Sequence, residues 1–101
     1  MEILTDRRVR DSIKELSDVD QGRILKHLDL LTRYGFTLPN KYLKKLSSNL
    51  WELRPGNIRL LLGISRARNK IVIVHGFKKK AQRTPRKELE TANLRIKEYG
   101  S

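Results

Sequence analysis

Apolar residues recur every three or four positions in two runs within the first third of the chain. They are Val9, Ile13 and Leu16 in the first run and Ile24, Leu28 and Leu31 in the second. Such spacing places each set on one face of an amphipathic helix. The polar stretch "SDVD" between them offers Ser17, Asp18 or Asp20 as the N-cap of the second helix, and Gly35 ends it. We therefore expect two antiparallel helices joined by a tight turn.

The apolar pattern changes to short β-rich runs after Leu50. The runs are "LWELR", "IRLLLGISR" and "KIVIVHGF", and the turn-forming sequences "PGN" and "ARN" separate them. Parallel strands need long crossover connections, so such closely spaced runs favour an antiparallel meander. Near the N-terminus "EILT" predicts one more short strand. The polar connector "TLPNKYLKKLSSN" predicts no strand, only one helical turn from Tyr42 to Leu46.

The last segment, "TPRKELETANLRIKEYG", has the pattern of a closing helix. Thr84 is suited to the N-cap and Pro85 to the first helical position. The apolar residues at near-helical spacing are Leu89, Ala92, Ile96 and Tyr99. We therefore predict an α+β fold in a single domain over residues 1–101. In this fold an N-terminal helical hairpin packs on a three- or four-stranded antiparallel sheet, and a C-terminal helix closes the structure.

Alternation along the predicted strands separates the two faces of the sheet. In the second β-rich run Arg59 alternates with Ile58 and Leu60. In the first run Glu52 and Arg54 share one side. A helical hairpin covers only one face of a sheet, so we expect the other face to expose Arg54 and Arg59. They would lie near the strand end where the lysines begin, so that the cations converge on a concave surface.

Positive charge is concentrated in about one third of the chain. The formal net charge is +12. Residues 53–87 contain eleven Lys and Arg residues and no Asp or Glu, whereas the remainder has twelve basic and eleven acidic residues. A basic surface that served only solubility would spread its charge more evenly. Because contacts with phosphates release condensed counterions, the asymmetry predicts an extended polyanion as partner, either nucleic acid or the ribosome.

The residue types exclude several kinds of site. The chain has no cysteine and two histidines, His27 and His75, which leaves no disulfide and too few ligands for a typical zinc site. No acidic cluster accompanies Glu52 to hold Mg²⁺, and we expect no cofactor. No apolar run approaches the roughly 20 residues of a membrane span, and the N-terminus lacks the apolar stretch of a signal peptide. We therefore expect no membrane partner and a cytoplasmic location.

The chemistry that these residues leave open is metal-free phosphoryl transfer on RNA. There a ribose 2′-OH attacks the neighbouring phosphate, and Arg and Lys side chains stabilise the developing negative charge. A histidine or a carboxylate moves the proton. The candidate residues also have structural alternatives. These are His75 as a packed side chain in phase with Ile71 and Ile73, Glu52 as a cross-strand partner of an arginine, and residues 78–80 as a solvated turn.

Three stretches together resemble the RelE/ParE toxin superfamily, and in particular its HigB-like branch. They are "LWELRPGNIRLLLGI", "IVIVHGFKKKAQRTP" and the closing "RIKEY". The resemblance runs over nearly the whole chain and is strongest from Leu50 to Pro85. It implies a helical pair on an antiparallel sheet with a closing helix. It also implies a toxin of a type II toxin–antitoxin module that acts as a ribosome-dependent mRNA endonuclease.

The resemblance, taken with the charge distribution, also implies roles for particular residues. The expected catalytic residues are Arg59, Lys79, Lys80 and Glu52, with no metal. The expected RNA-binding residues are Arg54, Arg66, Lys78, Arg83 and Arg86. RelE-type members carry lysines where this chain has Leu50 and Glu52, and a catalytic tyrosine in the final segment that has no equivalent here. Glu52 and Lys79 are therefore the candidates for general base and acid.

The partners that the resemblance implies are mRNA on the ribosome and a cognate antitoxin. The antitoxin would carry a DNA-binding helix-turn-helix, as HigA-like proteins do. The uncompensated cations of residues 53–87 predict that it approaches with an acidic segment. Two other functions stay open, because the chain has no clear acid and base pair. One is a non-enzymatic inhibitor of DNA gyrase, like ParE members, and the other is an inactive RNA-binding relative.

Overall fold

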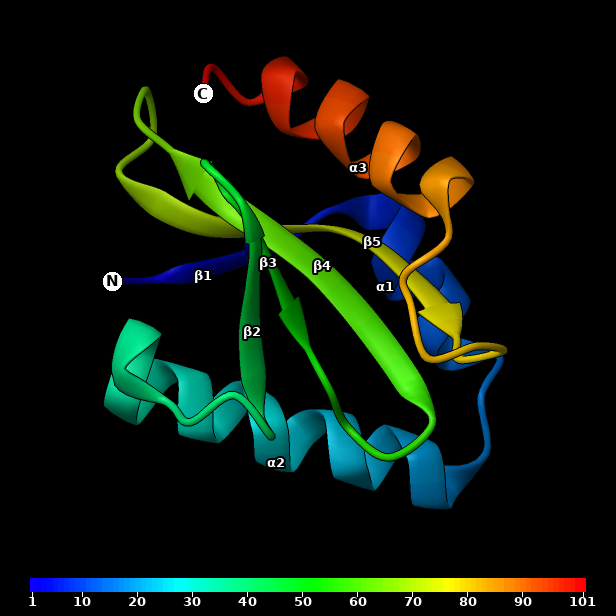
Figure 1. The fold of residues 1–101 in the computed structure, drawn as a ribbon. Coiled ribbons are helices and arrows are strands. Elements are labelled where there is room, and N and C mark those ends of the chain that lie inside the picture. Colours follow the sequence, from blue (N-terminus) through cyan, green and yellow to red (C-terminus); the bar gives the residue numbers. More distant parts are fainter.

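The computed structural model describes residues 1–101 and has a five-stranded sheet between helices (Figure 1). In chain order the elements are β1 (Ile3–Thr5), α1 (Arg7–Lys14), α2 (Asp18–Tyr34), a 3-10 turn (Gly35–Thr37), β2 (Leu43–Ser47), β3 (Leu50–Leu53), β4 (Ile58–Ser65), β5 (Lys70–Lys78) and α3 (Arg86–Glu98). The strand order is β1-β5-β4-β3-β2. Neighbouring strands are antiparallel except β1, which runs parallel to β5. The predicted α+β class is thereby confirmed.

The two edge strands account for the differences from the predicted sheet. β1 was expected, but it pairs in parallel with β5, so the sheet is mixed rather than purely antiparallel. β2 occupies the residues that were expected to form a helical turn. Its apolar residues Leu43 and Leu46 are three positions apart, which imitates helical spacing. In a strand, residues three positions apart point to opposite faces, so Leu43 joins the core on one face of the sheet and Leu46 packs against the core on the other. The register of β2 against β3 shifts between Lys45 and Ser47.

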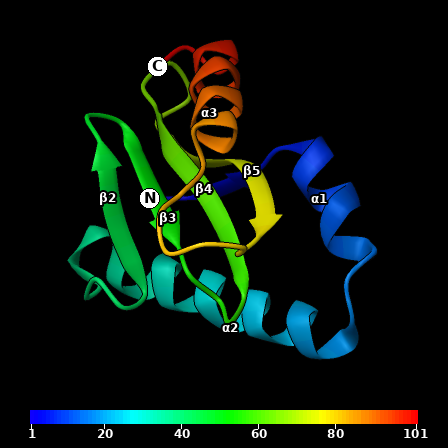
Figure 2. The ribbon, with the colours of Figure 1, turned by 45° about the vertical axis from the view of Figure 1, so that its right-hand side comes forward.

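One face of the sheet packs against α1 and α2. The core on this side includes Val9, Ile24, Leu31, Leu53, Leu60 and Ile73. Asp6 caps α1 by accepting a hydrogen bond from the Arg8 N–H, and Ser17 caps α2 by accepting one from the Asp20 N–H. The expected helical pair thus covers one face of the sheet. The two helices meet at a steep angle rather than antiparallel, with α2 running across the sheet (Figures 1 and 2). None of the helices combines the length and apolar character needed to cross a bilayer.

The opposite face packs against α3, so the sheet lies between two helical layers (Figure 2). The core on this side is formed by Leu50, Leu61, Val72, Val74, Ala92 and Ile96. α3 approaches closely at Gly63, where a Cβ atom would come 2.6 Å from the carbonyl oxygen of Asn49 and 2.9 Å from Cγ1 of Ile96. The N-cap position of α3 is Pro85, without a side-chain cap. The prediction that Thr84 caps this helix is therefore wrong.

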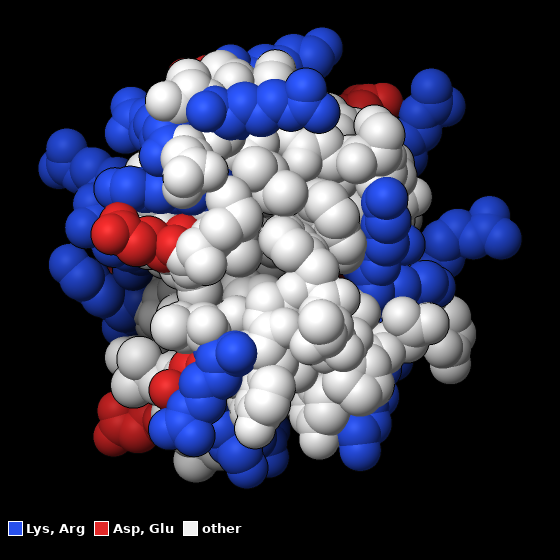
Figure 3. Space-filling model, turned by 90° about the vertical axis from the view of Figure 1, so that its left-hand side faces the viewer, with Lys and Arg blue, Asp and Glu red and all other residues white.

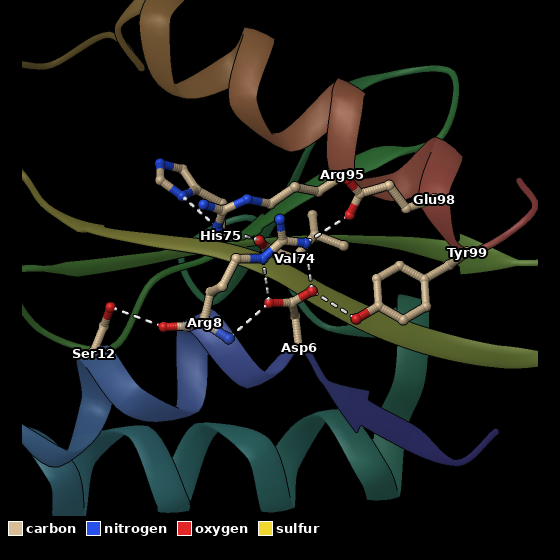
Figure 4. Close-up of polar contacts among 8 residues, drawn as sticks. All are labelled: Asp6, Arg8, Ser12, Val74, His75, Arg95, Glu98 and Tyr99. Atoms are coloured by element: carbon tan, nitrogen blue, oxygen red, sulfur yellow. Dashed lines mark hydrogen bonds and ion pairs between the residues drawn. The ribbon is translucent and has the colours of Figure 1, made fainter.

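A buried carboxylate joins the two ends of the chain (Figure 4). Asp6 is 3% exposed, and it accepts hydrogen bonds from Arg8 Nε at 2.9 Å and from the Tyr99 hydroxyl at 2.6 Å. Arg8 also donates to Glu98 at 2.6 Å. The bond from Arg8 holds the pKa of Asp6 well below its usual range, and burial raises the pKa of Tyr99. The cluster fastens the C-terminal end of α3 to the start of α1.

Candidate nucleic-acid site

Glu52 on β3 is a buried carboxylate with two arginines beside it. It is 3% exposed. Arg54 Nε lies 3.2 Å from Glu52 Oε1, and Nε of Arg59 on β4 lies 3.8 Å from the same oxygen. Thr84 donates its hydroxyl to the other oxygen, Oε2. Glu52 therefore brings together β3, β4 and the segment that leads into α3.

Arg59 does not lie on an exposed strand face, as the alternation had suggested. It is 8% exposed, and its Nη1 donates to the carbonyl oxygens of Gly56 at 2.8 Å and Ile58 at 2.9 Å. Burial lowers the pKa of Arg59, and the charge of Arg54 acts in the same direction while Glu52 opposes it. The face that was expected to be open is instead covered by α3 and crossed by residues 79–85 (Figure 2). Arg59 thus adds positive potential from inside the protein.

A pocket of about 170 Å³ opens beside Glu52. Its lining comes from four parts of the chain: Lys44 and Leu46 of β2, Glu52 and Arg54 at β3, Gln82, Arg83 and Thr84 of the connecting segment, and Leu89 of α3. The Arg54 side chain is 25% exposed, so a ligand can reach it. Three lining residues are cations, whereas the one carboxylate already has partners within the protein. The pocket is therefore suited to an anionic group such as a phosphate.

Lys44 is a pocket residue that the sequence analysis missed. It lies directly opposite Glu52 across the β2–β3 pair. The next residue, Lys45, is directed elsewhere, with its Nζ 5.4 Å from the centre of the Trp51 ring. The signal that could have found Lys44 is its cross-strand position, but that position exists only once Leu43–Ser47 is recognised as a strand.

The three lysines at the end of β5 are exposed and lie where β4 begins. Lys78 pairs with Ile58 in the β4–β5 register, and the Lys79 N–H donates to the carbonyl oxygen of Asn57 at 2.7 Å. None of Lys78, Lys79 and Lys80 forms an ion pair. They do not line the pocket, but residues 79–85 connect them to it.

Two predicted RNA-binding residues lie apart from this group. Arg66 is in the turn between β4 and β5, at the opposite end of this hairpin from Lys78, about 25 Å away by strand length. Arg86 is exposed in the first turn of α3 and pairs with Glu90 at 3.2 Å. On the side of the molecule where the N-terminus and the C-terminal end of α2 lie, Lys and Arg surround a largely uncharged area (Figure 3). The cations therefore converge only in part.

His75 lies on the α3 side of the sheet, not in phase with Ile71 and Ile73 as alternation predicted. A register shift in the β4–β5 pair places it opposite Leu61. Its Nε2 lies 2.9 Å from Glu88 Oε1 on α3. Leu61 of β4 pairs with Glu52 on one side and with His75 on the other. His75 therefore lies two strand spacings, about 10 Å, from Glu52. No group of three or more histidine and carboxylate side chains is arranged to hold a metal ion.

Comparison with known protein families identifies the family of this chain. Residues 11–97 match the family described as "Phage derived protein Gp49-like (DUF891)". The chain belongs to the Gp49-like family. This is a family of RelE/HigB-type toxins, so the Gp49-like chain is a toxin of the RelE superfamily and of a toxin–antitoxin system. The resemblance inferred from the sequence is thereby confirmed.

The fold of the Gp49-like chain is that of RelE. It is similar to a chain in the crystal structure of the archaeal RelE–RelB complex from Pyrococcus horikoshii OT3, with a TM-score of 0.62 and 17% sequence identity. The match covers 81% of this chain and 97% of that chain. Among curated proteins, none matches the sequence.

Proposed function

We propose that this Gp49-like toxin is a ribonuclease that cleaves mRNA on the ribosome by metal-independent phosphoryl transfer. The observation that carries the proposal is the pocket beside Glu52, which is large enough for a phosphate group and has Lys44, Arg54 and Arg83 in its lining. Toxin family membership and the RelE fold support the same activity. The action takes place where ribosomes are, in the cytoplasm.

The proposed reaction needs stabilisation of charge more than any special nucleophile. The ribose 2′-oxygen forms a bond to the neighbouring phosphorus, the bond to the 5′-oxygen breaks, and the products are a cyclic phosphate and a 5′-hydroxyl. Arg54 and Arg83 stabilise the additional negative charge on the phosphate, as preorganised donors do in other enzymes. Lys79 is exposed and unpaired, so it can donate a proton to the leaving 5′-oxygen, while water accepts the proton of the attacking 2′-hydroxyl. Glu52 holds Arg54 and Thr84 in place, and Arg59 contributes its buried charge.

The remaining cations serve to bind the mRNA backbone. Lys78 and Lys80 provide phosphate contacts outside the pocket, at the end of β5, and Arg86 provides a further contact on α3. Arg66 contacts more distant RNA, because it lies at the other end of the hairpin. Contacts of this kind carry affinity without sequence preference.

An antitoxin is the proposed protein partner. The similar RelE chain comes from a complex with RelB, which supports an antitoxin for this toxin as well. We expect this antitoxin to be a helix-turn-helix protein of the HigA type that represses its own operon.

Expression in growing cells with pulse labelling tests the proposed activity. Protein synthesis should stop within minutes, and mapped mRNA ends should show internal cleavage. Continued translation together with a DNA-damage response would instead support a ParE-like inhibitor of gyrase. Normal growth with a folded protein would support an inactive RNA-binding relative.

A further inference from the structure

An apolar hollow lies on the α1 side of the sheet, away from the pocket beside Glu52. It has a volume of about 140 Å³. Its walls are Val9 and Ile13 of α1, Ile58 and Leu60 of β4, and Gly76 and Phe77 of β5. An apolar cavity of about 150 Å³ takes up a benzene molecule. The hollow therefore has room for one leucine or phenylalanine side chain.

The hollow is accessible from solvent at two exposed residues. Ser12 of α1 stands on one side, and its hydroxyl bonds only to the Arg8 carbonyl oxygen at 3.0 Å (Figure 4). Lys78 stands on the other side. The wall contains no pair of aromatic rings that could enclose a nucleotide base, and it offers few groups that could form hydrogen bonds with a base. A nucleotide is therefore disfavoured as the occupant.

Positive charge borders the hollow at its β5 side. Lys78 is part of the lining, and Lys79 is anchored through its N–H to Asn57, the neighbour of Ile58. With Lys80 these side chains are exposed and have no carboxylate partner. An apolar hollow beside unpaired cations is complementary to an apolar anchor flanked by carboxylates.

We propose that an acidic helical segment of an inhibitor protein docks here. It inserts one leucine or phenylalanine into the hollow and places its carboxylates over Lys78, Lys79 and Lys80. The identification of this inhibitor as the antitoxin rests on the proposed function. Docking neutralises lysines to which the proposed function assigns contacts with the mRNA backbone, so mRNA binding is weakened although the inhibitor need not enter the pocket.

Amide shifts of the ¹⁵N-labelled chain with a synthetic peptide test the docking. The peptide is a 16-residue helix with leucine along one face and glutamate at most other positions. The amides of Ser12, Gly76 and Lys78 should shift together. A peptide with serine in place of leucine, and one with lysine in place of glutamate, should each leave them unshifted. Equal shifts with the serine peptide, or none with the acidic leucine peptide, would overturn the proposal.

Filling the hollow provides a second test with a matched control. Ser12→Trp places a large side chain at the entrance and should weaken peptide binding about tenfold or more, equal to about 1.4 kcal/mol. Ser48→Trp, in the exposed turn between β2 and β3, should bind as the unaltered chain does. Equal affinity of the two variants would remove the hollow from the docking site. If the same amides shifted as the concentration of the chain alone was raised, the hollow would be the contact site of a second copy of the chain, and the proposal would be contradicted.

The docking and the proposed activity fail in distinguishable ways. Ser12 belongs to neither the pocket nor the lysine group, so Ser12→Trp should cleave mRNA as the unaltered chain does while escaping inhibition by the peptide. A chain that binds the peptide and cleaves no mRNA would refute the proposed function and leave the docking site intact.

Discussion

Thr84 donates a hydrogen bond to the buried carboxylate of Glu52. The bond fastens the connecting segment, residues 79–85, to β3, where Glu52 is also paired with Arg54. Thr84 and Arg83 are neighbours in this segment, so the bond also holds Arg83 in the pocket lining. The candidate site thus depends on the Thr84 side chain, which holds the connecting segment to Glu52 and does not cap α3.

Thr84→Val should destabilise the protein and loosen the connecting segment. The substitution keeps the shape of the side chain and leaves one carboxylate oxygen without its donor, a loss of about 1–3 kcal/mol. Urea denaturation measures the change in stability, and hydrogen exchange of residues 79–85 measures the loosening. Thr91→Val is the control, since the Thr91 hydroxyl bonds only a carbonyl oxygen within α3. Equal protection of residues 79–85 in both variants would contradict the anchoring role of Thr84.

Lys44→Ala should weaken RNA binding, whereas Lys45→Ala should not. The two lysines are adjacent on β2, but only Lys44 lines the pocket. Loss of one phosphate contact reduces the slope of log affinity against log salt concentration by about one. Binding of a fluorescent single-stranded RNA at several salt concentrations gives both quantities. A salt slope that changes equally in the two variants would place the RNA elsewhere.

Glu52→Gln should destabilise the fold strongly. The amide keeps the volume but removes the charge that compensates Arg59, which is 8% exposed. Removing one partner of a buried pair costs about 3–5 kcal/mol. The double variant Glu52→Gln with Arg59→Met should recover part of this loss, because it no longer buries an unpaired cation. Denaturation of the single and double variants measures the coupling. A single variant within about 1 kcal/mol of the unaltered chain would fall below this range and show that Glu52 is not needed there.

Asp6→Asn should remove stability at neutral pH and have less effect in acid. Arg8 and Tyr99 hold the pKa of Asp6 below its value of about 3.9 in an unfolded chain. The stabilisation is therefore complete above that value and is lost as the pH falls through the lower, folded pKa. Unfolding measured from pH 7 down to pH 2 should show the two proteins converging. Parallel curves would contradict the prediction.

The control for this prediction is Asp29→Asn. Asp29 forms an exposed pair with Arg33 four residues along α2, at 3.2 Å. Such pairs contribute about 0.3–0.5 kcal/mol, so this variant should differ little from the unaltered chain at any pH.

The elements that the sequence predicted well are those with strong local patterns. The helices around Val9, Ile24 and Ile96 follow from spacing within each segment, and so does the hairpin of β4 and β5. β1 has only three residues, and its partner β5 lies far along the chain, so local alternation does not indicate a parallel pair. β2 was missed because its two apolar residues, Leu43 and Leu46, lie three positions apart, which is also the spacing of one helix face.

Part of the candidate site was also accessible from alternation. It placed Glu52 and Arg54 on one side of their strand, and the structure confirms this arrangement. The burial of Arg59 depends on the path of residues 79–85, which no periodicity specifies. His75 changed face because of the register shift in the β4–β5 pair. Long-range placement and bulges therefore explain what sequence patterns left undetermined.

Cleavage of mRNA in a reconstituted translation reaction tests the central proposal most directly. The purified chain should generate internal 5′-hydroxyl ends on ribosome-bound mRNA, and the double variant Lys44→Ala with Arg54→Ala should do so about 100-fold more slowly or worse while still folded. Mapping of the RNA ends over time gives these rates. Intact mRNA after incubation with the folded, unaltered chain and ribosomes would contradict the account, and loss of gyrase supercoiling in a parallel reaction would identify the alternative.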